Sequence, residues 1–576
     1  MKYKRDYSVL QGYVASLFTV YFCMLGYIWW QRKNKPARQV LGESSVAVWR
    51  RTWQCRWRRW LGYEWQWMNT TMSLGRIICV CVLVGLNTAQ LLRARRIADD
   101  NNENENDDVA LALGQVQRDI YQQEMANRTG QLALVNFAVA VALSARYSIL
   151  LRPFGVDKTR IWHMWFARVG SCCTLFHACY QFVRNYARQE HDLWLTLTSN
   201  TRYFTGFCMM AATVVLFAGA HPLVRMLSYR LFRYLHITAF GVMVLVSFLH
   251  HWTFALFYVA VVGVWFVDQL QQYGVGTRQA RLVAMEVLSG KVLKLQVQPS
   301  YSHKNTLTPG QFVFLSLKSS RLSSWLHAHP FSVARLDACT DIKTAEDNET
   351  DQVNPFATAN RSYSPYLEAD SRQAVLTFYI KSIGKHTTAW HKLAQTADVS
   401  TDIPIVISKP LGRPLLDAAG RGYGDFEQVV LVAEGIGITP WISVLQYMEQ
   451  QQYHVRTKEL VLIWSIRDTE MLHAFADELS RLTKSIHLQY QIDIYLTRLS
   501  GIEEGHPSIR HSHIQCGRPD YASLLEDVRS RCSQIDVALG MCAHEETIRT
   551  CGNIARSAKY SHGYSQWVIH NEQFQI

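Results

Sequence analysis

The chain has 13 cysteines in 576 residues, yet no two of them are spaced as a CxxC pair. Structural zinc sites commonly use that spacing, so the sequence argues against a zinc site. The cysteines are dispersed, and Cys172, Cys173 and Cys179 lie within one apolar stretch, which argues against a disulfide framework. A cleavable signal peptide of the usual form is also lacking, because Arg and Lys follow the first apolar segment where small residues are expected.

Charge and hydrophobicity are unevenly distributed along the chain. Hydrophobic residues make up 49% of it, which fits neither a disordered nor a fully soluble protein, and its length exceeds one ordinary domain. The formal net charge is +13, and arginines alternate with tryptophans between Trp49 and Trp60. A basic stretch with aromatics can bind nucleic acid. This one lies between two apolar segments, so we expect a cytosolic juxtamembrane loop and no nucleic-acid partner.

Long apolar stretches fill the first half of the sequence. They run approximately over 10–30, 72–92, 131–151, 162–183, 203–221, 234–251 and 252–268. These lengths predict a multi-spanning α-helical membrane domain of about seven helices. Lys and Arg crowd the loops after the first stretch and before the fourth and sixth, which places those loops in the cytosol. The acidic segment 97–128, with the sequon Asn127-Arg128-Thr129, is then a loop on the far side, as is the N-terminus, and everything after about 268 is cytosolic.

Four histidines repeat one spacing in two of these stretches. His163 and His177 are 14 residues apart, and so are His236 and His250. On an α-helix, 14 residues fall about 40° short of four turns and span about 21 Å, so each pair shares one face of its helix. Polar groups inside a bilayer are costly and usually functional, although any one of them could be a hydrogen-bonded core residue. We interpret the pairs as axial ligands of two b-type haems, His163 with His236 near the cytosol and His177 with His250 near the far side; His251 is the alternative to His250.

The pattern changes at about residue 275. Short strand-like segments followed by a polar, insertion-like loop at 336–372 predict an antiparallel β-barrel. From Val429 onward, strands alternate with a Gly-rich turn and helices, which predicts a parallel sheet in an α/β domain. The predicted strands are Val283–Val287, Val292–Val297, Gln311–Leu315, Val375–Ile380 and Ile403–Ile407, then Val429–Ala433, Leu460–Trp464, Leu488–Ile494 and Ile535–Leu539.

Two motifs in the predicted barrel suit a flavin nucleotide. In the first, an aromatic ring and a hydroxyl stand together, as stacking and hydrogen bonding at a flavin require. The second is a Gly turn with Lys and hydroxyl groups, which can receive a diphosphate or be an ordinary solvated turn. Their candidate residues are His329, Pro330, Phe331 and Ser332 in the first, and Lys381, Gly384, His386 and Thr387 in the second.

The α/β part contains a candidate site for a second nucleotide. Gly435, Gly437, Thr439 and Pro440 join a buried strand to a helix, where two glycines allow a pyrophosphate to approach the backbone. The motif is not a GxGxxG fingerprint, and a tight strand-to-helix turn is the alternative. Arg467 follows the next strand and can pair with a 2′-phosphate, which favours NADPH, although a surface arginine is the alternative.

Taken in order, these motifs resemble the ferric reductase and NADPH oxidase superfamily of flavocytochromes b over roughly residues 70–576. The paired histidines, HPFS, KxxGxHT, GxGITP, WxxR and Gly517-Arg518-Pro519 carry the resemblance, whose details are most similar to yeast ferric-chelate reductases. It implies a six-helix bis-haem core, preceded here by one extra helix, and then a ferredoxin-reductase-like module. The expected domains are the N-terminal helix and basic loop (1–70), the haem domain (71–270), the FAD-binding barrel (275–415) and the NADPH-binding domain (425–576).

The resemblance also implies an activity. Electrons from cytosolic NADPH are expected to pass through FAD and two haems to a ferric or cupric chelate, or to O2, across the plasma membrane or the endoplasmic reticulum; the oligomeric state stays open. Cys542 is expected near the nicotinamide as the catalytic residue, and Phe574, close to the chain end, is expected to shield the flavin. The chain departs from the family pattern at Lys409-Pro410-Leu411-Gly412 and Cys542-Ala543-His544. Those departures motivate the alternative of a non-catalytic membrane regulator or scaffold.

Overall fold

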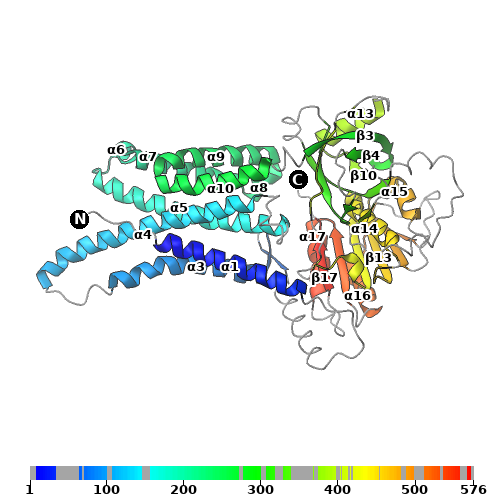
Figure 1. Ribbon diagram of the computed structural model, residues 1–576, viewed down its shortest axis with the longest axis horizontal. Helices are drawn as coiled ribbons and strands as arrows, with labels where there is room; N and C mark the ends of the chain where they lie inside the picture. The colour runs from blue at the N-terminus through cyan, green and yellow to red at the C-terminus, as the bar shows by residue number, and fades with distance from the viewer. Residues whose placement is uncertain are drawn as a thin grey trace, which may run out of the picture.

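The protein is described by a computed structural model in which a bundle of long helices lies beside two β-sheets with flanking helices (Figure 1). All structural statements below concern the residues that this structure describes. These are 8–33, 64–67, 70–99, 107–145, 156–270, 277–299, 306–317, 328–338, 367–368, 374–396, 403, 405–412, 416, 420–452, 454–481, 488–498, 512–531, 536–557 and 567–572.

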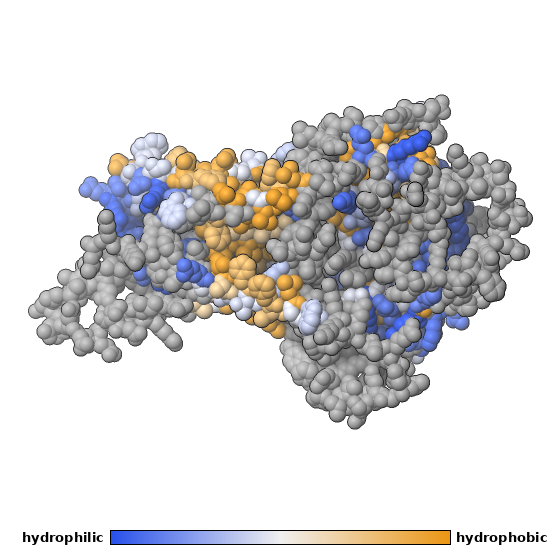
Figure 2. Space-filling view, viewed as in Figure 1, coloured by the Kyte–Doolittle hydropathy of each residue, from blue (hydrophilic) through white to orange (hydrophobic). Residues whose placement is uncertain are grey.

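The bundle contains the helices that the apolar stretches predict, although the third stretch is only partly described. Its helices are α1 (Ser8–Lys33), α3 (Leu74–Asp99), α4 (Asp107–Leu143), α5 (Val156–Arg188), α6 (Leu193–Thr198), α7 (Thr201–Gly219), α8 (Pro222–Leu227), α9 (Tyr229–His250) and α10 (Trp252–Leu270). Within the described ranges, Thr201–Gly219 and Leu231–His250 are long and apolar enough to cross a membrane. Apolar residues cover much of the visible bundle, and hydrophilic residues lie at the end away from the sheets (Figure 2).

The prediction of a loop over 97–128 is wrong. Helix α3 continues to Asp99 and α4 begins at Asp107, so most of this segment is helical. The reason is that residues 107–128 are rich in Ala, Leu and Gln, which favour a helix even where the sequence is too polar for a membrane core. The sequon therefore lies on a helix, where Thr129 is buried and its hydroxyl donates to the carbonyl oxygens of Met125 and Ala126.

Three buried polar side chains tie α1, α3 and α4 together. The Tyr13 hydroxyl donates to Asn136 Oδ1 (3.1 Å), Asn136 Nδ2 donates to Asn87 Oδ1 (2.8 Å), and Asn87 Nδ2 donates to the Tyr13 hydroxyl (2.8 Å). Each side chain both gives and receives a hydrogen bond, so the ring is closed. In an apolar bundle such a closed ring fixes how the first two helices pack on α4, because any slip leaves buried polar groups unpaired.

Capping side chains set the helix ends around the candidate histidines. Asp192 and Asn200 accept hydrogen bonds from backbone N–H groups in the first turns of α6 and α7, and Ser228 does the same for α9. Helix α9 ends at His250 because the next residue, His251, adopts an extended backbone. These caps are typical N-cap residue types, and they fix the helical register in which the histidines face the bundle interior.

The first sheet of the second half is antiparallel, as predicted, with strand order β7-β6-β11-β3-β4-β10-β8. Its two edge strands, β7 and β8, are separated by only two residues in sequence, so the sheet must curl into a half-barrel. The strands are β3 (Thr277–Leu288), β4 (Val292–Pro299), β6 (Phe312–Ser316), β7 (His329–Ser332), β8 (Arg335–Ala338), β10 (Ala374–Lys381) and β11 (Ile405–Ser408), with 3-10 turn η2 (Ser289–Lys291) between β3 and β4.

The predicted inserted loop runs over 336–372, and its first bound is wrong. Strand β8 extends to Ala338, because Leu336 is buried in the sheet opposite Leu376. Near the other bound, β9 (Leu367–Glu368) pairs with β5 (Thr306–Leu307). A second short hairpin, β1 (Glu64–Trp67) with β2 (Thr70–Ser73), lies at the end of the predicted basic loop.

The C-terminal sheet is parallel throughout, as predicted, with strand order β15-β14-β13-β12-β16-β17. The order reverses between β12 and β16, and ligands of such sheets bind outside the carboxyl ends of the strands at that reversal. The strands are β12 (Gln428–Glu434), β13 (Glu459–Ile466), β14 (Gln489–Leu496), β15 (Ser512–Cys516), β16 (Val537–Cys542) and β17 (Trp567–Asn571). The helices are η4 (Tyr423–Asp425), η5 (Gly435–Ile438), α14 (Thr439–Gln450), α15 (Thr469–Arg481), α16 (Tyr521–Arg531) and α17 (Glu545–Arg556).

Candidate functional site

One predicted histidine pair meets inside the bundle. His163 of α5 and His236 of α9 have ring centres 6.3 Å apart. His163 Nδ1 lies 2.7 Å from the Ala140 carbonyl oxygen of α4, so this nitrogen donates and Nε2 is left to act as a ligand. Imidazole nitrogens bind metals such as zinc at about 2.0–2.1 Å, so this separation leaves room for a metal ion between the rings.

The other pair faces a cavity of about 330 Å³, which also has His251 in its wall. His177 Nδ1 lies 2.6 Å from the Ala126 carbonyl oxygen of α4. His250 Nδ1 lies 3.0 Å from the Thr205 hydroxyl of α7. Both rings are therefore held through Nδ1, which again leaves Nε2 available. His251 shares this cavity, but its extended backbone places it beyond the helix end.

The two α5 histidines are anchored by the same neighbouring helix. Their acceptors, Ala126 and Ala140, are themselves 14 residues apart on α4, which repeats the spacing of His163 and His177. Because α4 and α5 pack side by side, one register between them satisfies both imidazoles. Oriented neutral imidazoles of this kind suit axial iron ligation.

Glycines make room for the rings of the pair at the cavity. A Cβ atom at Gly130 would lie 3.1 Å from two ring atoms of His177, and one at Gly206 would lie 3.2 Å from His250 Cε1. Larger residues would push the rings into the cavity. Arg128 and Arg202 also line it, and their cationic groups suit an anionic substituent such as a haem propionate. The chemistry of this donor set fits a haem. No sequence pattern distinguishes the two glycines, because membrane helices contain many of them.

The two predicted flavin motifs lie together. Strand β7 carries His329 and Phe331, and helix α13 (Lys385–Thr396) carries His386 and Trp390. The His329 and His386 ring centres are 5.2 Å apart, and those of Phe331 and Trp390 are 5.6 Å apart. Segments about 50 residues apart in sequence therefore form one aromatic-walled corner at the edge of the half-barrel. Ser332 is buried beside it, and Pro330 lies on the same strand.

The turn before α13 is organised by its own threonine. Thr387 Oγ1 accepts hydrogen bonds from the backbone N–H groups of Ile383 and Gly384, each at 3.1 Å. These amides are thus already engaged, so a diphosphate here would use the following N–H groups at the helix N-terminus. A Cβ at Gly384 would meet no atom within 4 Å, and Lys381 lies just before this open surface.

The predicted NADPH motif lies at the strand-order reversal of the parallel sheet. Gly435 has φ +55° and no atom near its Cβ position, so its backbone faces open space. At Gly437 a Cβ would lie only 2.2 Å from the Cys542 carbonyl oxygen, so this motif packs directly on the end of β16. Trp464 Nε1 donates to the Gly435 carbonyl oxygen (2.9 Å) and links β13 to the same turn. Arg467 is exposed just beyond β13.

The remaining predicted residues of this region have distinct places. Thr439 and Pro440 begin α14, and the Thr439 hydroxyl donates to the Ile436 carbonyl oxygen (2.7 Å) within the turn. Burial, assisted by the charges of Glu572 and Glu434, raises the pKa of the Cys542 thiol to about 12. This thiol is therefore neutral at physiological pH and is not a thiolate nucleophile. Phe574 lies outside the described residues.

A cluster around Glu434 was missed by sequence reasoning. This carboxylate, at the end of β12, accepts hydrogen bonds from the His544 side chain, from its backbone N–H (2.9 Å) and from the Thr547 hydroxyl (2.6 Å). Burial alone would raise the pKa of Glu434, but these hydrogen bonds hold it below its usual range. The cluster connects the glycine turn to the start of α17. His544 and Thr547 are 110 and 113 residues from Glu434 in sequence, so no local pattern could indicate the cluster.

Two family models match the chain. Residues 129–248 match the ferric reductase like transmembrane component, and residues 426–556 match the ferric reductase NAD binding domain. The first match contains all of the predicted metal-binding histidines except His250. The second contains the glycine turn, Arg467 and Cys542.

Individual relatives are distant. A superoxide-generating NADPH oxidase heavy chain of Dictyostelium discoideum is 19% identical over 74% of this chain and 64% of its own length. Ferric reduction oxidase 2 of Arabidopsis thaliana is 22% identical over 56% of this chain and 39% of its own length. The chain therefore spans less than two thirds of the length of these curated relatives. Neither is a yeast protein, so the resemblance to the yeast branch stays a prediction.

Similarity to solved structures is weak. A flavohemoglobin from Malassezia yamatoensis, solved with bound FAD and heme, covers 78% of this chain and 97% of its own, with a TM-score of 0.35 and 14% identity. A score this low does not support a common overall fold.

Proposed function

Because the chain belongs to the ferric reductase and NADPH oxidase superfamily, we propose that it moves electrons from cytosolic NADPH across a membrane to an acceptor on the far side. The acceptor is a ferric or cupric chelate, or O2. One observation carries the proposal: two imidazole pairs, one near each end of the same helices, lie in a bundle joined to a nucleotide-binding type of sheet. We propose the same four domains that the sequence predicts, with the soluble module in the cytosol.

The proposed binding residues follow from this arrangement. His163 with His236, and His177 with His250, are the axial ligands of two b-type haems. His329, Pro330, Phe331, Ser332, Lys381, Gly384, His386 and Thr387 hold FAD, and Gly435, Gly437, Thr439, Pro440 and Arg467 hold NADPH. Phe574 shields the flavin. When bound, NADPH and FAD supply hydride transfer and the haems supply single-electron transfer.

The protein's own groups position these cofactors. The Nδ1–H groups of His163 and His177 donate hydrogen bonds to backbone carbonyl oxygens of α4. Both rings therefore present Nε2 to the bundle interior. The contact between Gly437 and Cys542 shapes the crevice at the strand-order reversal. A neutral Cys542 thiol there would add no charge beside a bound nicotinamide. His250 is preferred to His251 as ligand because its ring is held by Thr205.

An enzyme is favoured over the scaffold alternative. The relatives are named as superoxide-generating NADPH oxidases and as ferric reduction oxidases, and both descriptions are electron-transfer activities. The altered KPLG motif still keeps contact with the half-barrel, because Leu411 exchanges backbone hydrogen bonds with Phe312. We therefore propose a membrane oxidoreductase, and the plasma membrane and the endoplasmic reticulum are the two candidate compartments.

The test uses the purified full chain in detergent, loaded with haem and FAD. NADPH is added without oxygen while the flavin and haem absorption bands are followed. We expect the flavin to be reduced first and the haems next. Admitting a ferric chelate or O2 then reoxidises the haems, and superoxide dismutase sensitivity of dye reduction separates an oxidase from a metalloreductase. A loaded protein that leaves NADPH unoxidised with every acceptor would overturn the proposal.

A further inference from the structure

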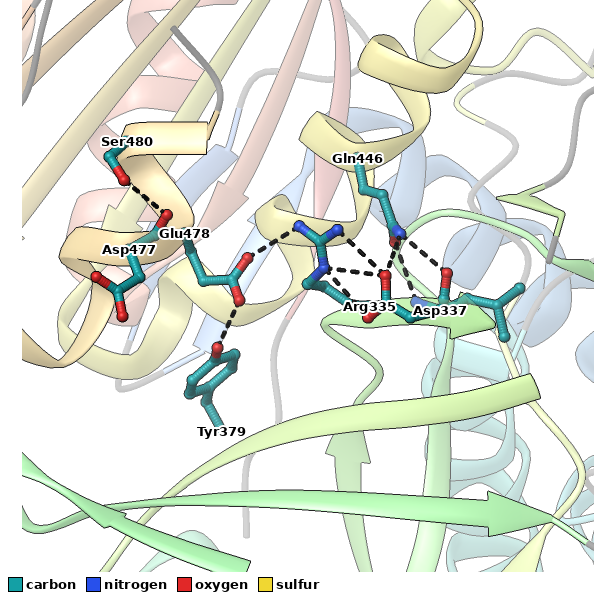
Figure 3. A network of polar contacts seen from close by, with 8 residues as sticks. Arg335, Asp337, Tyr379, Gln446, Asp477, Glu478 and Ser480 are labelled. Atoms are coloured by element: carbon teal, nitrogen blue, oxygen red, sulfur yellow. Dashed lines mark hydrogen bonds and ion pairs between the residues drawn. The ribbon is translucent and has the colours of Figure 1, made fainter. Parts of the chain in front are cut away.

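A buried polar network crosses the contact between the half-barrel and the parallel-sheet domain (Figure 3). Arg335 of β8 donates to Glu478 Oε2 of α15 at 3.0 Å. The Tyr379 hydroxyl of β10 donates to the other oxygen, Glu478 Oε1, at 2.7 Å. One carboxylate of the nucleotide domain is therefore held by two strands of the half-barrel at once.

A second carboxylate and an amide extend the network. Arg335 also contacts Asp337 on its own strand, at 3.2–3.3 Å. Gln446 of α14 accepts a hydrogen bond from the Leu336 backbone N–H (3.0 Å) and donates to the Leu336 carbonyl oxygen (2.9 Å) and to Asp337 Oδ1 (3.2 Å). We call Arg335, Asp337, Tyr379, Gln446 and Glu478 the interdomain network. Its bonds join two strands of one domain to two helices of the other.

The network is shielded from solvent. The Arg335 and Glu478 side chains are 14% and 5% exposed, and Tyr379 and Gln446 are buried. Burial and the adjacent Glu478 charge raise the pKa of Tyr379, so its hydroxyl remains a donor at physiological pH. Buried charged groups tolerate little displacement, because a lost partner cannot be replaced by water. The network therefore favours one relative position of the two domains.

Each linking element leads directly to a proposed cofactor motif. Arg335 follows Ser332 of the first flavin motif by three residues, and Tyr379 precedes Lys381 of the second by two. Gln446 lies on the helix that begins at the glycine turn. Glu478 lies on the helix that follows Arg467. The elements that hold both nucleotides are thus bonded to one another away from the nucleotides themselves.

Uncharged contacts also cross this interface, among them the contact between the rings of Tyr379 and Phe475, whose centres are 4.7 Å apart. The Gly310 backbone N–H donates to the Ser443 hydroxyl of α14 (2.8 Å). Gly290, in the turn between β3 and β4, lies so close to α15 that a Cβ there would be 3.3 Å from the Met471 backbone nitrogen. These contacts hold the surfaces together but involve no charge. The interdomain network is where directional, charged bonds determine the angle between the domains.

We propose that the interdomain network positions the nicotinamide against the flavin, so that Arg335, Tyr379 and Glu478 are positioning residues for hydride transfer. This inference rests on the proposed function. Hydride transfer needs close approach and alignment of the reacting atoms, and a displacement of about 1 Å can cost about 100-fold in rate. The network touches neither nucleotide site directly, so it acts through the geometry between the domains.

The test compares Glu478→Gln with Asp536→Asn in the full chain. Glu478→Gln keeps the side-chain shape and removes the charge that Arg335 contacts. Asp536→Asn is the matched control, since Asp536 pairs with Arg421 at 2.9 Å, with side chains 15% and 14% exposed, immediately before the first residue of β16. Anaerobic rapid mixing with NADPH measures flavin reduction per bound FAD. Haem and FAD content, and haem reduction by dithionite, are measured in parallel.

We expect Glu478→Gln to slow flavin reduction about 10- to 100-fold at saturating NADPH, with little change in the NADPH concentration for half-saturation. Asp536→Asn should leave the rate unchanged. Tyr379→Phe removes one hydrogen bond, and we expect it to slow the step about fivefold, in keeping with a net value near 1 kcal/mol for such a bond. Equal rates per bound FAD in wild type and Glu478→Gln would overturn the inference.

Two further results keep the outcomes distinct. If Glu478→Gln does not fold, Tyr379→Phe decides alone, and an unchanged rate in that variant overturns the inference. If wild-type protein loaded with FAD is not reduced by NADPH, the proposed function itself fails. If NADPH reduces the flavin of the wild-type protein and of the variants at the same rate, only the positioning role is rejected.

Discussion

The helical bundle and the module formed by the half-barrel and the parallel-sheet domain hold their candidate sites in different ways. In the bundle, His163, His177 and His250 are each oriented by one hydrogen bond with a neighbouring helix. Helical periodicity places the histidines of each pair on one face of their helix. In the module, each site is assembled from several strand ends that meet only in the folded sheets. A bundle site therefore depends on a few residues at regular spacing. A module site depends on contacts between segments far apart in sequence.

This difference predicts different responses to substitution. Removing one bundle ligand should affect one haem and leave the flavin chemistry intact. Removing one module contact should change how two nucleotides meet, while all cofactors stay bound.

His177→Ala should remove one haem per chain and abolish electron delivery to the far side. The imidazole is a proposed axial ligand, and its hydrogen bond to the Ala126 carbonyl oxygen is lost with it. Haem content and low-temperature spectra of the purified protein measure the loss, and NADPH should still reduce the flavin. His251→Ala is the control and should keep both haems. Two low-spin haems in His177→Ala would refute the ligand assignment.

Gly437→Ala should slow NADPH-dependent flavin reduction by about 10- to 100-fold. The new Cβ would lie 2.2 Å from the Cys542 carbonyl oxygen, so the glycine turn or the end of β16 must move. Overpacking of this kind typically costs about 1–3 kcal/mol of stability. Gly422→Ala is the matched control, because its Cβ would meet nothing within 4 Å. Equal rates in the two variants would show that this contact does not shape the crevice.

Asn136→Leu should destabilise the bundle without changing electron transfer in the protein that remains folded. The substitution breaks the closed ring and leaves Tyr13 and Asn87 with unpaired groups, at about 1–3 kcal/mol for each buried group. Thermal loss of the monodisperse peak in size-exclusion chromatography should shift down by several degrees. Thr19→Ala, which removes an exposed hydroxyl bonded only to its own helix, should not shift it. An unchanged transition in Asn136→Leu would mean that the ring does not hold these helices.

Glu434→Gln should remove a small pH dependence of the hydrogen-exchange protection at the start of α17. The wild-type carboxylate has a lowered pKa, so its ionised form stabilises the fold. That stabilisation is complete above the usual glutamate value of about 4.3 and is lost as the pH falls through the lower, folded-state pKa. Hydrogen exchange of peptides from α17, corrected for intrinsic rates, should show protection falling below about pH 4 in wild type but not in the variant. If protection falls equally with pH in both proteins, Glu434 is not the group that causes the pH dependence.

The sequence was most informative where one periodicity governs the structure. Local sequence patterns were enough to predict the bundle helices, the shared helix faces of the paired histidines, the antiparallel strands and the parallel sheet. The loop predicted over 97–128 failed because hydropathy records polarity, whereas the helix there depends on backbone propensity. The predicted start of the insertion failed because Leu336 is paired with Leu376, and that partner cannot be known from the strand itself.

The candidate sites also contain both residues that a local sequence pattern indicates and contacts that form only in the folded protein. The histidines could be predicted from their spacing, but Gly130 and Gly206 could not, since only the packed helices bring them against the rings. The nucleotide motifs could be predicted singly. The contact of Gly437 with Cys542, the Glu434 cluster and the interdomain network all join residues about 100 or more positions apart, and only the folded sheets bring them together.

The central claim is that electrons cross the bundle from one side of a membrane to the other. The direct measurement uses sealed liposomes containing the haem- and FAD-loaded protein, with a ferric chelate and a ferrous indicator trapped inside and NADPH added only outside. We expect the wild-type protein to reduce the trapped chelate and His177→Ala not to reduce it. Both proteins should still oxidise NADPH when a soluble acceptor for electrons from the flavin is supplied outside the liposomes. Reduction of the trapped chelate by His177→Ala at the wild-type rate would contradict it.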